Sequence, residues 1–254
     1  MKQSRSVVNA RREFILNELE KTGTVEVKVL AERLQVSYLT IRRDLQYLED
    51  HKLLERFYGG ARGGDESLLK TPEKGILYYR EKIAKFAASL IEDGDSIFIN
   101  TSSTALGIVK YITAKNVTII TNNGNIISEK NPPNATVVLL GGELRYQKGT
   151  MVGSFALNNM NRVTARKSFV GCRGLSPDLG MTTELYDEAN INAKMISRVT
   201  ETSYILADHT KLGNKSSFIS CKASEIANII TDVEAPRDIV NAFREKGVEV
   251  YQID

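Results

Sequence analysis

Hydrophobic and polar positions follow a helical spacing over roughly the first fifty residues of the chain. The pattern predicts three short amphipathic helices between residues 11 and 50, and Ser37 precedes the third at the position of an N-cap. In that helix Ile41, Leu45 and Leu48 recur at i, i+4 and i+7, which places them on one apolar stripe. Three short helices joined by tight turns are typical of a helix-turn-helix.

The pattern changes after the third helix. Residues 53–58 form a short apolar, β-compatible run that ends at Gly59-Gly60, which predicts a small hairpin. Glycines and Pro72 then stand among charged residues, a composition that favours a linker. We therefore expect a winged helix-turn-helix domain over residues 1–62, a linker over residues 63–75 and a larger domain over residues 76–254.

The larger domain alternates between two kinds of segment. Short β-branched runs end in Gly, Asn, Ser or Thr, and amphipathic helical patterns lie between most of them. This alternation predicts an α/β fold of the Rossmann-like kind, with a mostly parallel sheet covered by helices on both faces. The expected strands are 96–100, 117–121, 136–140, 168–171, 204–207, 229–231 and 248–251, and the expected helices are 81–91, 104–114, 184–200 and 237–246.

Charge is distributed unevenly along the chain. Residues 1–62 hold 12 basic and 9 acidic residues, a surplus that equals the net charge of +3 of the whole chain. Excess positive charge in one segment suits a polyanion such as DNA, because neutralised phosphates release their counterions. A surplus this small is explained equally well by an ordinary solvated surface.

Cysteine content and hydropathy narrow the classes of protein further. Cys172 and Cys221 can form neither a disulfide framework nor a CxxC metal pair, so we expect two small buried residues in a reducing compartment. The N-terminal residues lead into no hydrophobic signal region, and no apolar run approaches the ~18 residues of a membrane span. We therefore expect a cytoplasmic protein without a metal or cofactor.

The third predicted helix carries polar groups opposite its apolar stripe. An arc of Thr40, Arg43 and Gln46 lies there, and Arg42 borders it. Arginine can pair with guanine, glutamine with adenine, and threonine can contact base edges or phosphate, as a recognition helix requires. On the pattern alone, an amphipathic surface helix with ordinary charges explains these residues equally well.

The run Ser37–Leu45, followed by Leu48, resembles the recognition helix of the DeoR family of bacterial transcription regulators. Residues 54–61 resemble that family's wing, although many members carry histidine where Tyr58 stands. The resemblance implies a helix in the major groove and a wing on the backbone or minor groove. The DNA contacts it implies are Ser37, Tyr38, Thr40, Arg42 and Arg43, supported by Arg56 and Tyr58.

A second group of polar residues follows predicted strands of the larger domain. The apolar run 97–99 leads into Asn100-Thr101-Ser102-Ser103-Thr104 and then a helix, a hydroxyl-rich turn suited to phosphate or carboxylate. Two other strands end at Asn122-Asn123-Gly124 and at Gly141-Gly142-Glu143. Carboxyl ends of strands in open α/β sheets bind ligands, so these three loops predict a pocket. Each loop alone is more simply explained as a turn or a helix cap.

Nearly all of residues 76–254 resembles the effector domain of the DeoR family, a relative of sugar-phosphate isomerases and coenzyme A transferases. The resemblance implies that a phosphorylated sugar binds, with its phosphate at Thr101, Ser102, Ser103 and Thr104. The residues implied around the sugar part of this ligand are Asn122, Asn123, Gly141, Gly142 and Glu143. Lys211 would supply a cation, although without the family it reads as a solvated loop charge. Many members carry glycine where Ser102 stands, so ligand size or affinity is expected to differ.

An enzyme is the alternative to a regulator. A sugar-phosphate isomerase or deaminase needs a carboxylate or histidine base, and the chain has His51, His209 and the acids Glu143, Glu184 and Asp208. No pair of these stands at a spacing that demands catalysis, and no Walker, GxGxxG, HExxH or GxSxG motif is present. A purely architectural DNA-binding protein would leave the pocket loops unexplained. The resemblance therefore favours a regulator, by family habit a repressor, that acts as a homo-oligomer on operator DNA.

Overall fold

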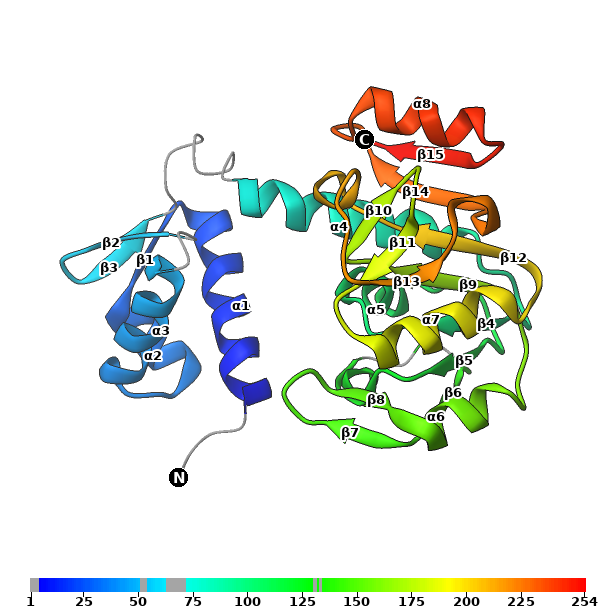
Figure 1. Ribbon diagram of the computed structural model, residues 1–254. Helices are drawn as coiled ribbons and strands as arrows, with labels where there is room; N and C mark the ends of the chain where they lie inside the picture. The colour runs from blue at the N-terminus through cyan, green and yellow to red at the C-terminus, as the bar shows by residue number, and fades with distance from the viewer. Residues whose placement is uncertain (1–4, 51–53, 63–71, 130–131, 133) are drawn as a thin grey trace. The chain divides into compact units, whose positions relative to one another are not determined.

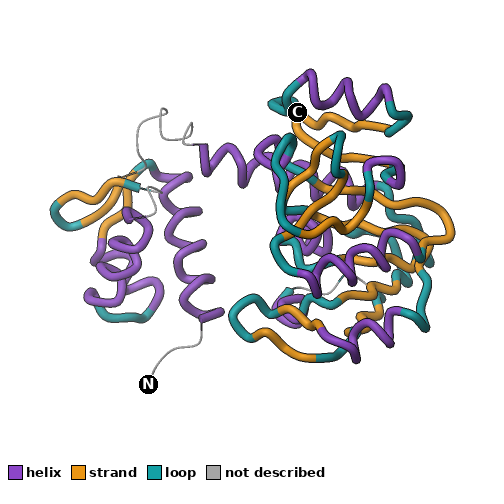
Figure 2. Tube along the Cα trace, in the orientation of Figure 1, coloured by secondary structure: helices purple, strands orange, loops and turns teal. Residues whose placement is uncertain are grey.

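The computed structural model describes residues 5–50, 54–62, 72–129, 132 and 134–254. The chain divides into two compact units, residues 1–75 and residues 76–254, and each is described by itself. Figures 1 and 2 show the first as helices with a small sheet, and the second as a large sheet with helices around it. Among the described residues, no helix combines the length and the apolar character needed to cross a membrane.

Three helices lie within the described residues 5–50 of the N-terminal unit, as the sequence predicted. They are α1 (Arg5–Thr22), α2 (Val27–Leu34) and α3 (Tyr38–Asp50). The apolar stripe of Ile41, Leu45 and Leu48 on α3 is fully buried and packs with residues of α1 and α2 in one core cluster. Burying this stripe leaves the opposite side of α3 exposed to solvent.

The predicted hairpin is confirmed as β2 (Glu55–Phe57) and β3 (Gly60–Arg62), joined at Tyr58-Gly59. A third strand that the sequence did not predict, β1 (Thr24–Glu26), pairs antiparallel with β3. A Cβ atom on Gly60 would lie 2.3 Å from the carbonyl oxygen of Val25, so only glycine lets β1 approach this closely. The unit is thus a winged helix-turn-helix.

Part of the predicted linker is helical instead. Helix α4 spans Pro72–Ser89, so residues 72–75 form its first turn. Proline is favoured there because the first N–H groups of a helix have no intrahelical partner to lose. The remaining predicted linker residues, 63–71, and His51 lie outside the described residues.

All seven predicted strands of the larger domain lie in one sheet. Its strands are parallel and follow the order β15-β14-β12-β9-β4-β5-β6. This topology confirms the predicted α/β fold. The strands are β4 (Ser96–Ile99), β5 (Thr118–Thr121), β6 (Thr136–Leu139), β9 (Ala165–Gly171), β12 (Val199–Leu206), β14 (Asn228–Asp232) and β15 (Glu249–Ile253).

Helices cover both faces of this sheet (Figure 1). Successive strand residues point to opposite faces, so Phe98 of β4 joins one core cluster while its neighbours Ile97 and Ile99 join the other. The cluster of Phe98 includes residues of α6 (Gly153–Met160), α7 (Tyr186–Ser197) and α8 (Arg237–Glu245). The other includes residues of α4 and of the short helix α5 (Ser103–Gly107).

A hairpin, a small antiparallel sheet and α6 were not predicted. Strands of three or four residues are too short to show an alternating pattern, which explains why the sequence missed them. The hairpin and the small sheet each supply part of the pocket wall described below. They are the hairpin β7 (Glu143–Arg145) and β8 (Thr150–Val152), and the sheet of β10 (Gly174–Ser176), β11 (Gly180–Thr183) and β13 (Phe218–Cys221).

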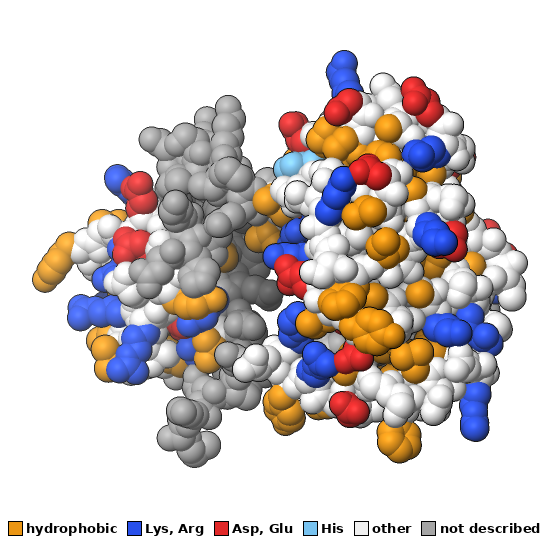
Figure 3. All heavy atoms as spheres, in the orientation of Figure 1, with side chains coloured by type: hydrophobic (Ala, Val, Ile, Leu, Met, Phe, Trp, Pro, Cys, Tyr) orange, Lys and Arg blue, Asp and Glu red, His pale blue; other side chains and the backbone are white. Residues whose placement is uncertain are grey.

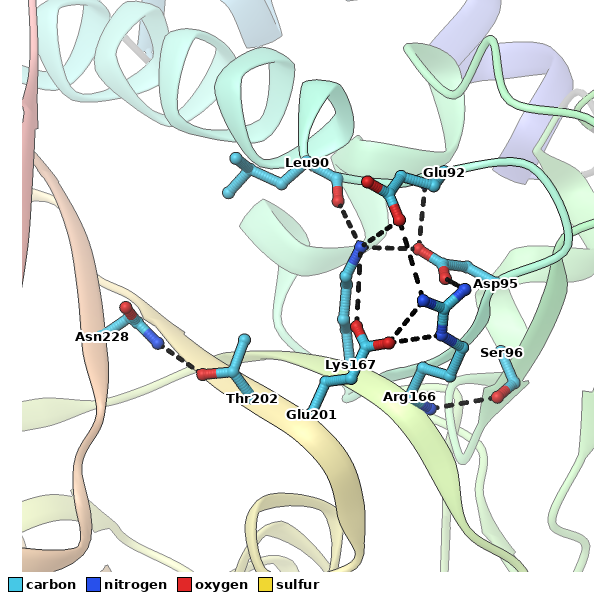
Figure 4. A network of polar contacts seen from close by, with 9 residues as sticks. All are labelled: Leu90, Glu92, Asp95, Ser96, Arg166, Lys167, Glu201, Thr202 and Asn228. Atoms are coloured by element: carbon cyan, nitrogen blue, oxygen red, sulfur yellow. Dashed lines mark hydrogen bonds and ion pairs between the residues drawn. The ribbon is translucent and has the colours of Figure 1, made fainter.

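A charged network joins the amino-terminal ends of β4, β9 and β12 (Figure 4). Lys167 Nζ donates to Asp95 Oδ2 at 2.9 Å and to the Leu90 carbonyl oxygen at 3.0 Å. Arg166 Nη1 lies 2.8 Å from Asp95 Oδ1, and Glu201 accepts from Arg166 Nε at 2.6 Å. Burial acts to lower the pKa of Lys167, but the hydrogen bond and the charge of Asp95 outweigh it and raise that pKa. Lys167 therefore stays charged although only 9% of its side chain is exposed.

Replacing Lys167 with methionine should lower the free energy of unfolding of the larger unit by about 1–3 kcal/mol. Asp95 would lose one cation in a fully buried position but would keep Arg166, which limits the cost. Faster hydrogen exchange of β4 and β9 would measure this loss. Lys85→Met on the exposed side of α4 is the matched control, and equal exchange in both variants would contradict the prediction.

Candidate functional site

Helix α3 is capped by Ser37. The Oγ atom of Ser37 accepts a hydrogen bond from the backbone N–H of Thr40 at 3.2 Å and lies 2.9 Å from Thr40 Oγ1. This confirms the predicted N-cap. Tyr38, the first residue of the helix, is exposed beside it. The hydroxyl groups of Ser37 and Thr40 are thus fixed at the start of the helix.

The solvent face of α3 presents two arginines. Arg42 and Arg43 are exposed, whereas their neighbours Ile41 and Leu45 are buried. Within the part of the chain that the structure describes, no carboxylate forms an ion pair with either arginine. Figure 3 shows lysine and arginine side chains gathered on the drawn face of this unit. A guanidinium without a carboxylate partner remains available for a phosphate or a guanine.

The wing is attached to α3 by Arg56. Its guanidinium donates to Gln46 and lies 3.6 Å from Glu49, whose carboxylate also accepts from the Arg56 backbone N–H at 3.0 Å. Tyr58 at the tip of the wing is fully exposed. The structure therefore brings the predicted residues of α3 and the wing together in one unit, and Gln46 holds the wing.

Asp44 points inward, away from the exposed arginines. Its Oδ2 accepts from Arg11 Nε and its Oδ1 accepts from Arg12 Nε at 3.0 Å, so both oxygens bind α1. Arg12 also lies over the ring of Tyr47, 3.4 Å from its centroid. Asp44 thereby fixes the rotation of α3 about its own axis, which decides what the exposed face presents.

The resemblance of α3 to a recognition helix implies that Arg43 reads a base, so replacing it with alanine should cost about 1–3 kcal/mol of operator affinity and relax specificity at one base pair. Binding of the full chain to an operator and to its single-base variants measures both effects. Lys115→Ala, an exposed cation of the larger unit, is the control for charge alone. A uniform loss over all DNA sequences would show that Arg43 contacts phosphate only.

A pocket of about 400 Å³ opens at the carboxyl ends of β4, β9 and β12. Its walls combine the hydroxyl-rich turn after β4 with residues from α4, the β7–β8 hairpin, β11 and α7. All of them belong to the larger unit. The lining residues are Arg80, Asn100, Thr101, Ser102, Ser103, Thr104, Lys148, Thr150, Gly171, Cys172, Arg173, Thr183, Glu184, Glu188, Asn192, Leu206, Asp208 and Lys211.

Asn100 holds the hydroxyl-rich turn in place from beneath. Its buried amide Nδ2 donates to the Gly171 carbonyl at 2.8 Å and to Asn192 Oδ1 at 3.0 Å. Its Oδ1 accepts from the backbone N–H groups of Gly171 at 3.0 Å and of Ser102 at 3.2 Å. One side chain thus joins the ends of β4 and β9 to α7, so the turn is preorganised for a ligand.

Cations outnumber carboxylates on the pocket wall. Arg80 pairs with Asp208 at 2.7 Å, Arg173 with Glu184 at 3.1 Å, and Lys148 lies 4.0 Å from Glu188. Lys211 has no ion pair among the described residues and remains as the surplus positive charge. The wall therefore favours an anionic ligand.

Two titratable groups of the wall are fixed in one protonation state. Burial acts to raise the pKa of Asp208, but hydrogen bonds from Thr210 and Arg80 outweigh it and hold that pKa below its usual value. Asp208 is therefore ionised at neutral pH. Burial, followed by the nearby charge of Asp208, raises the pKa of the Cys172 thiol to about 12, so this cysteine is a neutral part of the wall.

Two domains of one known family match the chain. The profile described as the DeoR C terminal sensor domain matches residues 78–233, more than half of the chain. The DeoR-like helix-turn-helix domain matches residues 11–66. The protein belongs to the DeoR family.

Named relatives agree with this assignment. The HTH-type transcriptional regulator FruR of Bacillus subtilis is 31% identical over 230 residues, covering 88% of this chain and 91% of the relative. A lactose phosphotransferase system repressor of Staphylococcus aureus is 34% identical over 232 residues, covering 88% and 92%. As a DeoR-family member with these relatives, the protein is a DNA-binding transcription regulator and not an enzyme.

Solved structures show a more distant similarity to this chain. Ribose 5-phosphate isomerase A of Methanocaldococcus jannaschii is 15% identical, covers 52% of this chain and 53% of its own, and has a TM-score of 0.36. A similarity this low carries no conclusion about activity.

The structure brings only some of the sequence-predicted effector residues of this DeoR-family protein to the pocket. Thr101, Ser102, Ser103, Thr104 and Lys211 line it. The five residues expected on the sugar side are absent from its described wall: Asn122, Asn123, Gly141, Gly142 and Glu143.

These five residues pack around the β7–β8 hairpin instead. Asn122 Nδ2 donates to the Met151 carbonyl of β8 at 3.1 Å. Asn123 Oδ1 caps the following 3-10 turn. Gly141 and Gly142 both have positive φ, and a Cβ on Gly142 would lie 2.5 Å from the Val152 carbonyl oxygen. The exposed Glu143 side chain lies over Gly153. The loops therefore position β8, whose Thr150 reaches the pocket in their place.

Several pocket residues were missed by sequence reasoning. Arg80 comes from α4 and Lys148 from the turn of the hairpin, whereas Glu188 and Asn192 come from α7. Glu188 and Asn192 stand four residues apart and so share one face of α7, a spacing that could have signalled a polar surface facing inward. No comparable signal marks Arg80.

Proposed function

We propose that this DeoR-family protein represses genes of sugar metabolism and that a phosphorylated sugar, bound in the sensor-domain pocket, lowers its affinity for operator DNA. The observation that carries the proposal is the meeting of four hydroxyl side chains, Thr101–Thr104, with a cation-rich wall. Hydroxyls and cations together bind a phosphate group, which offers several acceptor oxygens and up to two negative charges. The name of the Staphylococcus relative supports a sugar-linked gene set.

Specific groups would hold the two ends of such a ligand. Thr101–Thr104 and Lys211 would bind the phosphate. Sugar hydroxyls donate and accept hydrogen bonds, so they suit Thr150, Glu188 and Asn192 on the facing wall. Glu188 already accepts from Thr183 Oγ1 at 3.1 Å, which fixes its orientation toward a ligand.

DNA would be bound by the winged helix-turn-helix. Tyr38, Thr40, Arg42 and Arg43 of α3 would enter the major groove, with Ser37 at the helix start. Arg56 and Tyr58 of the wing would contact the adjacent backbone or minor groove. We propose a homo-oligomer, because two recognition helices on two half-sites multiply specificity and affinity. Acting on genomic DNA, the protein would reside in the bacterial cytoplasm.

Selection from fragmented genomic DNA of the source organism tests the proposal. We expect a few sharply enriched fragments beside genes of sugar transport or metabolism. Glucose 6-phosphate, fructose 1-phosphate, fructose 6-phosphate and galactose 6-phosphate are then added to the complex with an enriched fragment. At least one should release the DNA while its unphosphorylated sugar does not. If fragments are enriched but no phosphorylated sugar releases them, the proposed effector is contradicted. If no DNA fragment is enriched, assays for sugar-phosphate isomerisation would be the next experiment.

A further inference from the structure

Arg80 lies in the pocket but belongs to the helix that follows the linker. Its Nε donates to Asp208 Oδ2 at 2.7 Å, and 28% of its side chain is exposed. Its two terminal nitrogens form no hydrogen bond within the described ranges of the chain. One nitrogen of the Arg80 guanidinium group therefore binds Asp208, and the group lines the same pocket as Thr101–Thr104 and Lys211.

Asp208, in contrast, is held in place without Arg80. Its Oδ1 accepts from the backbone N–H of Thr210 at 3.1 Å and from the Thr210 hydroxyl. Its side chain is almost fully buried. The carboxylate thus forms a fixed part of the wall, and the longer, partly exposed arginine is the partner that can move.

We infer that Arg80 is an effector-binding residue that leaves Asp208 for the phosphate of the ligand, and that this exchange displaces α4 and so reaches the DNA-binding unit. The inference rests on the proposed function. A phosphate in the pocket competes with the Asp208 carboxylate for Arg80, and the planar guanidinium group of arginine binds two phosphate oxygens at once. The ligand therefore favours the arrangement in which Arg80 faces the pocket.

Helix α4 is well placed to pass on such a change. Tyr79, next to Arg80, packs edge-on against His209 with ring centroids 5.7 Å apart and donates to Glu234 at 3.3 Å. His209 belongs to the same turn as Asp208 and Lys211, so one turn of the pocket wall holds α4 through two adjacent residues. The helix begins at Pro72, eight residues and about 12 Å of helix before Arg80. Its first turn directly follows residues 63–71 of the predicted linker.

The affinity of Arg80 for the ligand and its effect on DNA binding can be tested separately. A ligand alters operator affinity only through unequal affinity for two arrangements of the protein. If Arg80 merely added affinity, saturating ligand would restore full release of DNA in its absence. If Arg80 transmits the signal, release stays small even when every pocket is occupied.

The experiment uses the full chain, an enriched genomic fragment and whichever of the four phosphorylated sugars releases it. Arg80→Gln removes the charge and the fork, and Arg80→Lys keeps the charge alone. Lys85→Gln removes an exposed cation from the same helix and is the matched control. Calorimetry gives the Kd of the phosphorylated sugar, and fluorescence anisotropy gives operator affinity without the sugar and at its saturation.

We expect Arg80→Gln to weaken sugar-phosphate binding by about 10- to 100-fold, as the loss of a charged hydrogen-bond pair does. Saturating sugar phosphate should lower operator affinity by about 5- to 150-fold in the wild type and in Lys85→Gln, the usual range of coupling between sites. In Arg80→Gln the same ratio should fall below about twofold. Arg80→Lys should recover part of the binding, which shows that the loss in Arg80→Gln follows the charge at this position.

Two results would overturn the inference while leaving the proposed function intact: unchanged sugar-phosphate affinity in Arg80→Gln, or full release of DNA by that variant at saturation. If no phosphorylated sugar releases the wild-type protein from DNA, both the inference and the proposed function are overturned. That failure is recognised because it is present before any substitution is made.

Discussion

Replacing Asp44 with alanine should destabilise the N-terminal unit by about 3–5 kcal/mol and abolish operator binding. Only 3% of the Asp44 side chain is exposed, and both of its oxygens accept from arginines of α1. Removing the carboxylate breaks two ion pairs at once, because Arg11 and Arg12 share it, and breaking a buried ion pair by removing one member typically costs about 3–5 kcal/mol. The loss also frees α3 to rotate relative to α1, so Arg42 and Arg43 no longer keep a fixed direction.

Hydrogen exchange on the full chain measures this prediction because it resolves the two units. Peptides of α1 and α3 should lose protection in Asp44→Ala, while those of β4 and β9 keep it. Glu32→Ala removes an exposed carboxylate from α2 and is the matched control, with a change below about 0.5 kcal/mol. Asp44→Asn keeps the shape but not the charge and should fall between the two. Intact protection with lost operator binding would show that Asp44 acts at the DNA and not on the fold.

The periodic pattern was sufficient to predict most of the fold. Most residues of the inner strands β4, β5, β9 and β14 and of the second half of β12 are buried, whereas the edge strands β6 and β15 are only partly buried. Burial on both faces produces continuous apolar runs that a sequence displays directly. The stripe of Ile41, Leu45 and Leu48 is equally plain, because α3 buries one face only.

The candidate site was predicted only in part, for a different reason. The hydroxyl-rich turn after β4 is a local sequence feature, so Thr101–Thr104 could be found from one strand and the residues that follow it. The Arg80–Asp208 pair joins residues 128 positions apart, and no local pattern indicates such a contact. The loops at residues 122–123 and 141–143 were correctly recognised as polar strand ends. Their glycines and amides, however, serve the close packing of β8, which only the folded chain reveals.

Replacing Gly171 with alanine should weaken sugar-phosphate binding at least tenfold and make operator binding insensitive to the effector. A Cβ atom at Gly171 would lie 2.0 Å from Ser102 Oγ and 2.3 Å from Ser102 Cβ, far closer than nonbonded atoms approach. Both atoms belong to the turn proposed to bind the phosphate. Overpacking of this kind typically costs about 1–3 kcal/mol. We expect it to displace Ser102 from the proposed phosphate site and so to weaken binding of the sugar phosphate.

A second substitution tests the cause. The next nearest atom to the added Cβ is the Leu206 carbonyl oxygen at 3.7 Å, an ordinary contact, so the clash rests on Ser102 alone. The double variant Gly171→Ala with Ser102→Gly should therefore recover most of the sugar-phosphate affinity, and Ser102→Gly alone reports what the hydroxyl contributes. Calorimetry on all three variants and the wild type separates the effects. Unimpaired binding in Gly171→Ala would place the effector elsewhere, and a failed rescue would assign the loss to a distortion of β9 itself.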